Sequence, residues 1–269
     1  MTLPFLTETA SPALIGMLHV PALPGTPDHA LPVGEIVARV GAEADLLAEA
    51  GVDAVLLENM HDVPYLRGGV GPEITAAMTA VAAHVSEVFP GPVGVQVLAG
   101  ANREAVAVAL AAGLQFVRVE GFVFGHVADE GWLDACAGPL LRYRRAIGAG
   151  HVAVLADIKK KHAAHASTAD VSLDDTARAA AFAGADAVII SGGATGEPAS
   201  PADLAAVRRA CDLPVVIGSG VTPANAADYA ATDALVVGSA LKEGGHWRGA
   251  VAPDRVAAMV AAVAELRRA

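Results

Sequence analysis

The sequence is poor in aromatic residues and in cysteine. Aromatic residues make up 4% of the 269 residues, whereas hydrophobic residues make up 54%. The core must therefore be built from alanine, valine, leucine and isoleucine, side chains that suit helices packed closely on buried parallel strands. The two cysteines, Cys136 and Cys211, show no metal-ligand spacing and no disulfide framework, which favours a reducing compartment.

Positive charge and long apolar runs are also scarce. The chain has 18 lysine and arginine residues against 29 aspartate and glutamate residues, a net charge of −11 with histidine neutral. This excess argues against nucleic acid as a partner, and an anionic ligand would need a local site. Apolar runs are short and interrupted, so we expect no membrane insertion. The start of the chain lacks the basic residues of a signal peptide, and we expect a cytoplasmic protein.

Eight short apolar runs alternate with segments of helical periodicity. The runs that we expect to be strands cover residues 13–19, 53–58, 93–98, 115–120, 152–157, 187–191, 214–218 and 234–238. A predicted helix follows each run, including one over 130–147 and a short one over 223–230. Eight such units with unbroken apolar strands predict an α/β fold, a closed (β/α)8 TIM barrel.

A short pattern recurs where the predicted helices pass into strands. It reads Ala-Gly-x-Asp-Ala-Val at 50–55 and at 183–188, with a looser copy at 112–117. We find no break in composition between the units, so we expect a single domain over residues 1–269 with an irregular lead-in at 1–12.

Polar residues stand at the ends of most predicted strands. In a TIM barrel these ends meet at one face, where active sites lie. The residues expected to be catalytic are His19, Glu58, Arg118, Glu120, Asp157 and Lys159, and those expected to contact a ligand include Asn59 and Gln96. Side-chain alternation predicts that Asp157 and Lys159 lie on the same side of their strand, as do Arg118 and Glu120. The alternative is a set of structural ion pairs, because buried charges are costly without partners.

The segment 157–162, Asp-Ile-Lys-Lys-Lys-His, combines a carboxylate, ammonium groups and an imidazole. Such groups suit acid–base catalysis, a Schiff-base lysine or phosphate contacts, for which Lys161 and His162 are candidates. The alternative for this segment, and for Lys160 in particular, is a solvated basic loop. A divalent metal site is a further alternative, with the candidate ligands His19, Glu58, Asp62, Glu120, Asp157 and His162. No spaced motif requires a metal, so the cofactor is left unknown.

Two glycine-serine turns near the C-terminus predict a phosphate site. In both, an apolar strand runs into Gly-Ser and then into a segment with helix-start chemistry. Such a turn points backbone N–H groups and the positive end of a helix dipole at one place, which suits an anion. TIM barrels bind phosphate after strands seven and eight. The expected ligand-binding residues are Gly218, Ser219, Gly220, Gly238 and Ser239, together with Ser191, Gly192, Thr195 and Gly196 after the sixth strand.

Seven phrases of the sequence resemble those of the BtpA/SgcQ family of TIM-barrel proteins. They are the segments 16–27, 57–64, 118–122, 141–145, 156–162, 191–196 and 237–242. The resemblance spans essentially the whole chain and departs mildly at Met60-His61. It implies a TIM barrel. It also implies one of two functional contexts. One branch of the family is named for photosystem I biogenesis or stability, and another accompanies sugar-transport and sugar-metabolism genes.

Two functions follow from these observations. The first is an enzyme that acts on a small phosphorylated metabolite, a sugar or nucleoside-like phosphate, by acid–base, lyase, isomerase or glycosyl-transfer chemistry at the strand ends. The second is a non-catalytic assembly or stability factor that binds a protein through the barrel surface. The second predicts an exposed apolar patch and no need for charged residues in the mouth. A homo-oligomer is left open.

Overall fold

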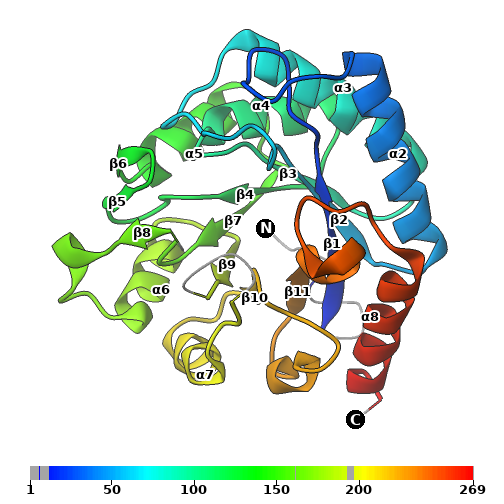
Figure 1. Cartoon of the computed structure of the whole chain (residues 1–269). Helices are drawn as coiled ribbons and strands as arrows, with labels where there is room; N and C mark the ends of the chain where they lie inside the picture. Colours follow the sequence, from blue (N-terminus) through cyan, green and yellow to red (C-terminus); the bar gives the residue numbers. More distant parts are fainter. Residues whose placement is uncertain (1–5, 7–11, 161, 193–196, 269) are drawn as a thin grey trace.

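The computed structural model describes residues 6, 12–160, 162–192 and 197–268. In this part of the chain, eight parallel strands close into a barrel in the order β1-β11-β10-β9-β7-β4-β3-β2, with helices around it (Figure 1). The barrel strands are β1 (Ala13–His19), β2 (Ala54–Glu58), β3 (Val93–Gln96), β4 (Phe116–Val119), β7 (Ala153–Asp157), β9 (Ala187–Ile190), β10 (Val215–Ile217) and β11 (Ala234–Val237). The predicted TIM barrel is confirmed, and the strands are up to two residues shorter than predicted. The predicted lead-in falls almost entirely outside the described residues.

Helices cover the outside of the barrel because each has one apolar face. The α-helices are α2 (Val33–Glu49), α3 (Pro72–Val88), α4 (Asn102–Ala112), α5 (Ala137–Ala146), α6 (Leu173–Phe182), α7 (Pro201–Ala210) and α8 (Pro253–Leu266). In α2 the buried positions Ile36, Val40, Ala44 and Leu47 recur every three or four residues, the spacing of one helical face. The predicted short helix over 223–230 is a 3-10 helix, η2 (Ala226–Tyr229).

Small residues let larger ones fill the inside of the barrel. A Cβ atom on Gly94 of β3 would lie 2.2 Å from the ring of Phe116 on the adjacent β4. Phe116 is fully buried and packs with Ile15, Leu56 and Leu155 in the interior cluster, which Leu6 also joins. The interior is thus filled with few aromatic residues, as the composition requires.

The recurrent pattern between helices and strands has one structural role. The Asp53 and Asp186 carboxylates of the pattern each accept a hydrogen bond from a backbone N–H on a neighbouring strand, at 2.6 and 2.8 Å, and Asp233, which precedes β11 outside the pattern, does the same at 2.7 Å. Gln115, in the looser copy, accepts one from Val93 N at 2.8 Å. Each side chain satisfies a strand-end donor at the N-terminal end of the barrel, so the repeat stabilises the fold and stands apart from the mouth.

The helix predicted over 130–147 is wrong in its first half. An antiparallel hairpin of β5 (His126–Ala128) and β6 (Gly131–Leu133) occupies this region, and β8 (Ala163–Ala164) pairs with β5. Gly131 has a φ of 111°, which an α-helix cannot accommodate, so α5 begins only at Ala137. The three strands form a small sheet beside the barrel (Figure 1).

Candidate functional site

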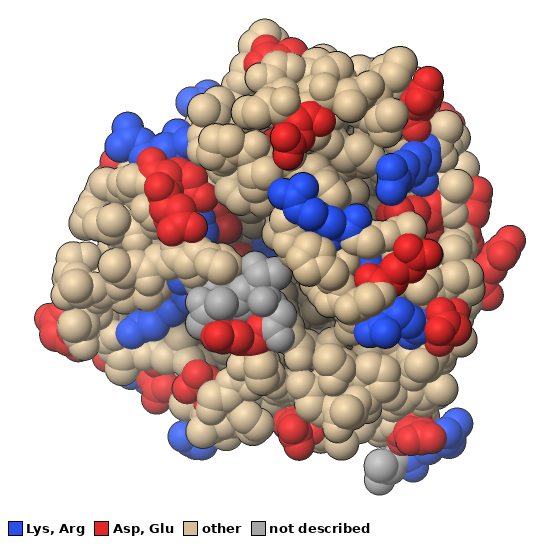
Figure 2. Space-filling view, in the orientation of Figure 1, with Lys and Arg blue, Asp and Glu red and all other residues tan. Residues whose placement is uncertain are grey.

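A cavity of about 370 Å³ opens at the C-terminal ends of the barrel strands. Figure 2 shows a hollow near the middle of this face. Its lining includes His19, Glu58 and Gln96, which are the last residues of β1, β2 and β3. Arg118 and Glu120 line it from β4 and the residue beyond. Parallel strands therefore bring these five predicted residues together from a sequence span of about a hundred positions.

Arg118 forms a buried, two-pronged ion pair with Asp157 on the adjacent strand β7. Arg118 Nε donates to Asp157 Oδ2 at 2.7 Å, and Nη2 donates to Oδ1 at 3.1 Å. Burial opposes the charge of Arg118, but Asp157 outweighs it and raises the pKa of Arg118 above its usual range. Arg118 faces the cavity, whereas Asp157 holds it from behind. The predicted alternative of a structural ion pair thus describes Asp157 well.

Glu120 and Lys160 form the second buried charge pair of the mouth. Lys160 Nζ lies 3.3 Å from Glu120 Oε2 and 3.4 Å from Glu130 Oε2. Glu120 Oε2 accepts no hydrogen bond from any described residue. Burial raises the pKa of Glu120 to about 7; Lys160 lowers it, while Asp157 raises it further. A carboxyl group of this kind can hold or release a proton near neutral pH.

The structure does not place Lys159 in the mouth. Strand β7 ends at Asp157, and Lys159 has a φ of 54°, so side-chain alternation no longer applies at this residue. Lys159 Nζ donates to Val171 O at 2.7 Å, whereas the next residue, Lys160, lines the cavity. Neither Asp157 nor Lys159 lines the mouth cavity, and both border a smaller cavity beside it. Lys160 is a buried member of the mouth, not part of a solvated loop. His162 also lines the cavity, and Lys161 lies outside the described residues.

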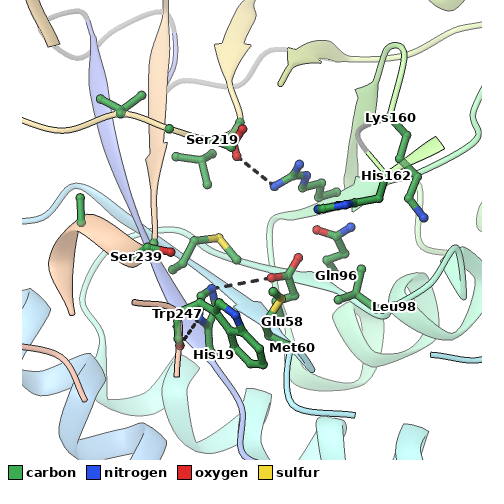
Figure 3. Close-up of a pocket in the computed structure, with 18 of the residues that line it drawn as sticks. His19, Glu58, Met60, Gln96, Leu98, Lys160, His162, Ser219, Ser239 and Trp247 are labelled. Carbon is green, nitrogen blue, oxygen red and sulfur yellow. Dashed lines mark hydrogen bonds and ion pairs between the residues drawn. The ribbon is translucent and has the colours of Figure 1, made fainter. Parts of the chain in front are cut away.

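His19 and Glu58 face each other on neighbouring strands (Figure 3). His19 Nε2 lies 3.8 Å from Glu58 Oε2, and Nδ1 lies 3.1 Å from Trp247 O. Gln96 completes this side of the cavity, and its buried Oε1 accepts no hydrogen bond from any of the described residues. A buried acceptor without a protein donor is a natural contact for a ligand hydroxyl or amine.

Both glycine-serine turns line the same cavity. The contributing residues are Gly218, Ser219 and Gly220 after β10, and Gly238 and Ser239 after β11. Gly220 has a φ of 73°, and a Cβ atom there would lie 2.2 Å from Glu197 O, so this turn requires glycine. Arg255 on α8 adds a cation beside the second turn, where its Nε donates to Ala240 O at 2.9 Å.

The residues after β9 lie beside the cavity. Ser191 Oγ accepts from Arg118 Nη2 at 3.4 Å, and Gly192 N donates to Ser219 Oγ at 3.3 Å. These contacts tie the end of β9 to the charged centre and to the β10 turn. The predicted contacts Thr195 and Gly196 lie outside the described residues.

Asn59 braces the loop after β2 and does not line the cavity. Its Nδ2 donates to Asp62 Oδ2 at 2.8 Å, and its Oδ1 accepts from Leu98 N at 2.7 Å. Asp62 in turn accepts from Leu23 N at 2.8 Å, which joins the loops after β1, β2 and β3. Both carboxylate oxygens of Asp62, a candidate metal ligand, therefore accept hydrogen bonds within these loops. Within the described residues, no group of three or more His, Cys, Asp or Glu side chains is arranged to hold a metal ion.

Several lining residues were missed by reasoning on strand ends, among them Tyr65, Lys160, Trp247 and Arg255. Tyr65 belongs to the long loop after β2, and its hydroxyl donates to Met60 O at 2.8 Å. Trp247 lies between the last strand and α8, and Arg255 lies in the first turn of α8. No pattern in this part of the sequence indicates that these side chains reach the mouth. Tyr65 lies in the polar, glycine-rich segment 59–72, and that composition was the available signal for a loop over the site.

The fold and the polar cavity define a TIM-barrel protein with its candidate site at the C-terminal mouth. The chain belongs to the BtpA family, whose sequence model matches residues 10–265. An uncharacterized protein of Caenorhabditis elegans, named as mitochondrial, is 44% identical over 98% of this chain and 97% of its own length. The photosystem I biogenesis protein BtpA of a Synechocystis strain is 34% identical over 96% of this chain and 90% of its own length.

Among solved structures, a thiamine phosphate pyrophosphorylase from Pyrococcus furiosus matches with a TM-score of 0.60. The match covers 94% of this chain and 96% of that chain at 14% sequence identity, so it shows a shared fold. None of the described helices is long and apolar enough to cross a membrane. The cytoplasmic location, the exclusion of nucleic acid and the homo-oligomer stay predictions.

Proposed function

We propose that this protein is an enzyme that binds a small phosphorylated metabolite, such as a sugar or nucleoside-like phosphate, in the mouth cavity. One observation carries the proposal: the glycine-serine turns and the Glu120–Lys160 pair line the same cavity. In the strand order of the closed barrel, β11 stands opposite β4. A ligand held at the β11 turn therefore extends across the mouth towards Glu120.

The phosphate group lies at the turns after β10 and β11. Backbone N–H groups and the Ser239 hydroxyl supply donors there, and Arg255 supplies positive charge, whereas the Ser219 hydroxyl donates to Glu197 O at 3.4 Å. Glu120 lies across the mouth from the β11 turn, and Glu58 ends β2, two strands from β11; their carboxylates disfavour an anion there. The local arrangement of charge thus orients the ligand although the whole chain is negative.

Glu120 is the proton-transfer group of the proposed reaction. Its pKa of about 7, raised mainly by burial, lets it accept a proton from the substrate or return one near neutral pH. The Lys160 ammonium group, 3.3 Å away, stabilises negative charge that develops beside the carboxyl group. His19 and Glu58, at the ends of β1 and β2, form a second polar pair, with His19 Nε2 3.8 Å from Glu58 Oε2. Lyase or isomerase chemistry at a carbon next to a carbonyl fits this set of groups.

The likeness to a thiamine phosphate pyrophosphorylase supports the proposal only through the fold, since the identity is 14%. The chemistry rests on the residues of this mouth.

Thermal unfolding in the presence of inorganic phosphate and a panel of sugar and nucleoside phosphates tests the proposal. We expect at least one of these compounds to raise the melting temperature of the wild type, because a ligand that binds only the folded state stabilises it. Ser239→Trp fills the turn and should abolish the ligand-induced shift. Asp157→Asn weakens the ion pair that positions Arg118 and should reduce the ligand-induced shift. Asp212→Asn, at an exposed position, should leave the shift unchanged. A wild type that no phosphate compound stabilises would refute the proposal.

A second candidate function is a protein-binding assembly or stability factor. Val127 and Trp132, 46% and 43% exposed, are cross-strand partners on the β5–β6 hairpin, and Phe124, 37% exposed, precedes β5 in the chain. The name of the Synechocystis relative also favours this role. In cells lacking that relative, rescue of photosystem I by this chain and by Glu120→Gln, but not by Trp132→Ser, would favour assembly over catalysis.

A further inference from the structure

A second cavity, of about 430 Å³, lies beside the mouth. Arg39 and Glu43 line it from α2, His61 from the loop after β2, and Lys242 and Arg248 from the segment between β11 and α8. His19 lines both cavities. The proposed function uses neither Lys242 nor the two arginines.

Lys242 forms the floor of the second cavity and is incompletely paired. Its side chain is 2% exposed, and its Nζ lies 3.8 Å from Glu43 Oε2, which is too long for a hydrogen bond. Glu43 Oε2 is itself buried and accepts no hydrogen bond within the described part of the chain. Burial lowers the pKa of Lys242, with Glu43 acting in the opposite direction. A buried ammonium group normally has closer partners than this, so the site has room for another anionic partner.

Arg39 and Arg248 stand at the opening of this cavity and are exposed. Arg248 lies over the Trp247 ring at 4.4 Å, and its Nη1 is 4.0 Å from Asp28 Oδ2. Figure 2 shows lysine and arginine side chains near one another over the segment between β11 and α8 and over α2, with acidic side chains beside them. An arginine contact at these distances leaves guanidinium N–H groups available to a ligand.

His61 lines the second cavity close enough to Lys242, Arg248 and Arg39 for all three positive charges to act on its imidazole. Burial, followed by Lys242, Arg248 and Arg39, lowers the pKa of His61 to about 4, and Asp28 acts in the opposite direction. His61 is therefore neutral near pH 7 and can donate one N–H. Three cations face the carboxylates of Asp28 and Glu43, so the cavity wall has an excess of one positive charge in a chain of net charge −11.

We propose that the second cavity binds a tetrahedral oxyanion, the phosphate group of a small metabolite, between Lys242 and the guanidinium groups of Arg39 and Arg248. Arginine forks match the geometry of phosphate oxygens, and a buried ammonium group supplies a point charge at the base. The anion becomes the close partner that Lys242 lacks. This site is separate from the phosphate position at the glycine-serine turns and does not depend on the proposed function.

Equilibrium dialysis of the full chain with radiolabelled inorganic phosphate measures the number of sites and their affinities. We expect two phosphates to bind per wild-type chain, one in the second cavity and, on the proposed function, one in the mouth. Arg39→Gln/Arg248→Gln should weaken one of them by at least about tenfold, because a hydrogen bond to a charged group contributes roughly one order of magnitude in affinity. Both arginines are exposed, so the double variant should fold. The matched control, Arg145→Gln/Arg209→Gln, removes two exposed arginines of α5 and α7 and should bind as the wild type does.

Variants of the two sites separate this proposal from the proposed function. A phosphate that is lost in Arg39→Gln/Arg248→Gln and retained in Ser239→Trp assigns an anion to the second cavity, whether or not the mouth binds one. Lys242→Met should remove the same phosphate. If the arginine double variant binds phosphate with the number and affinities of its control, the second site is refuted. The same holds if the wild type binds a single phosphate that only Ser239→Trp removes.

Discussion

The pH dependence of stability tests the position of Glu120 in the mouth. Burial raises the pKa of Glu120 from 4.5 to about 7, with Lys160 opposing the change and Asp157 adding to it. The folded state therefore keeps a proton that the unfolded state has already released between these pH values. The free energy of unfolding must fall as pH rises through this window, since the folded state there binds more protons than the unfolded state.

The magnitude follows from the size of the shift. At about 1.4 kcal/mol per pKa unit, a rise from 4.5 to about 7 corresponds to about 3 kcal/mol of stability, present at low pH and lost above about pH 7. Glu120→Gln removes the titrating group and preserves its size, and Lys160 keeps Glu130 at 3.4 Å. We expect the free energy of unfolding of the variant, relative to the wild type, to increase by about 2–3 kcal/mol between about pH 5 and about pH 8.

Urea denaturation of both proteins across this pH range measures the difference, and groups elsewhere in the chain cancel in it. Glu130→Gln is the matched control, because it takes a carboxylate from the same ammonium group and leaves Glu120 in place. A difference between Glu120→Gln and the wild type that does not change with pH would refute the reasoning. So would the same pH dependence in the two variants, since the effect would then belong to Lys160.

Three further predictions concern stability and are measured by urea denaturation. Asp233→Ala removes a strand-end acceptor and should lower the free energy of unfolding by about 1–3 kcal/mol; no loss would contradict a structural role for this side chain. Gly94→Ala should cost about 1–3 kcal/mol through the clash with Phe116, and Phe116→Leu in the same chain should recover part of it. Asp157→Asn should cost about 3 kcal/mol or more by leaving Arg118 buried without its anion, and a neutral effect would refute the buried pair.

The barrel could be predicted because strands buried on both faces appear as unbroken apolar runs between amphipathic helices. The β5–β6 hairpin could not, because its strands have three residues each and one of them pairs with β8, more than thirty positions along the chain. Sequence periodicity records only local structure. The helical composition around 130–147 outweighed the single signal against it, Gly131.

The strand-end residues of the site could be predicted for a geometric reason. His19, Glu58 and Gln96 end parallel strands, and parallel strands in a barrel end at one face. The sequence could not show that Lys160 lines the mouth and Lys159 does not, because side-chain alternation stops where β7 ends, two residues before Lys159. Arg255 was missed because the position of α8 over the last turn depends on packing of the whole chain.

The arrangement of charge also limits which reactions suit this mouth. Glu58 and Glu120 line the cavity on the side of β2 and β4, and Glu130 adjoins Lys160. A phosphate on that side would meet these carboxylates beside Arg118 and Lys160, cations that already pair with Asp157 and Glu120, whereas the turns after β10 and β11 offer N–H groups and Arg255. On the proposed function, the phosphate therefore acts as a handle, and the reacting carbon lies across the mouth near Glu120. On the proposed function, a reaction at the phosphorus atom would put the leaving group far from Glu120, whose pKa of about 7 suits proton exchange near neutral pH, so we propose chemistry at carbon.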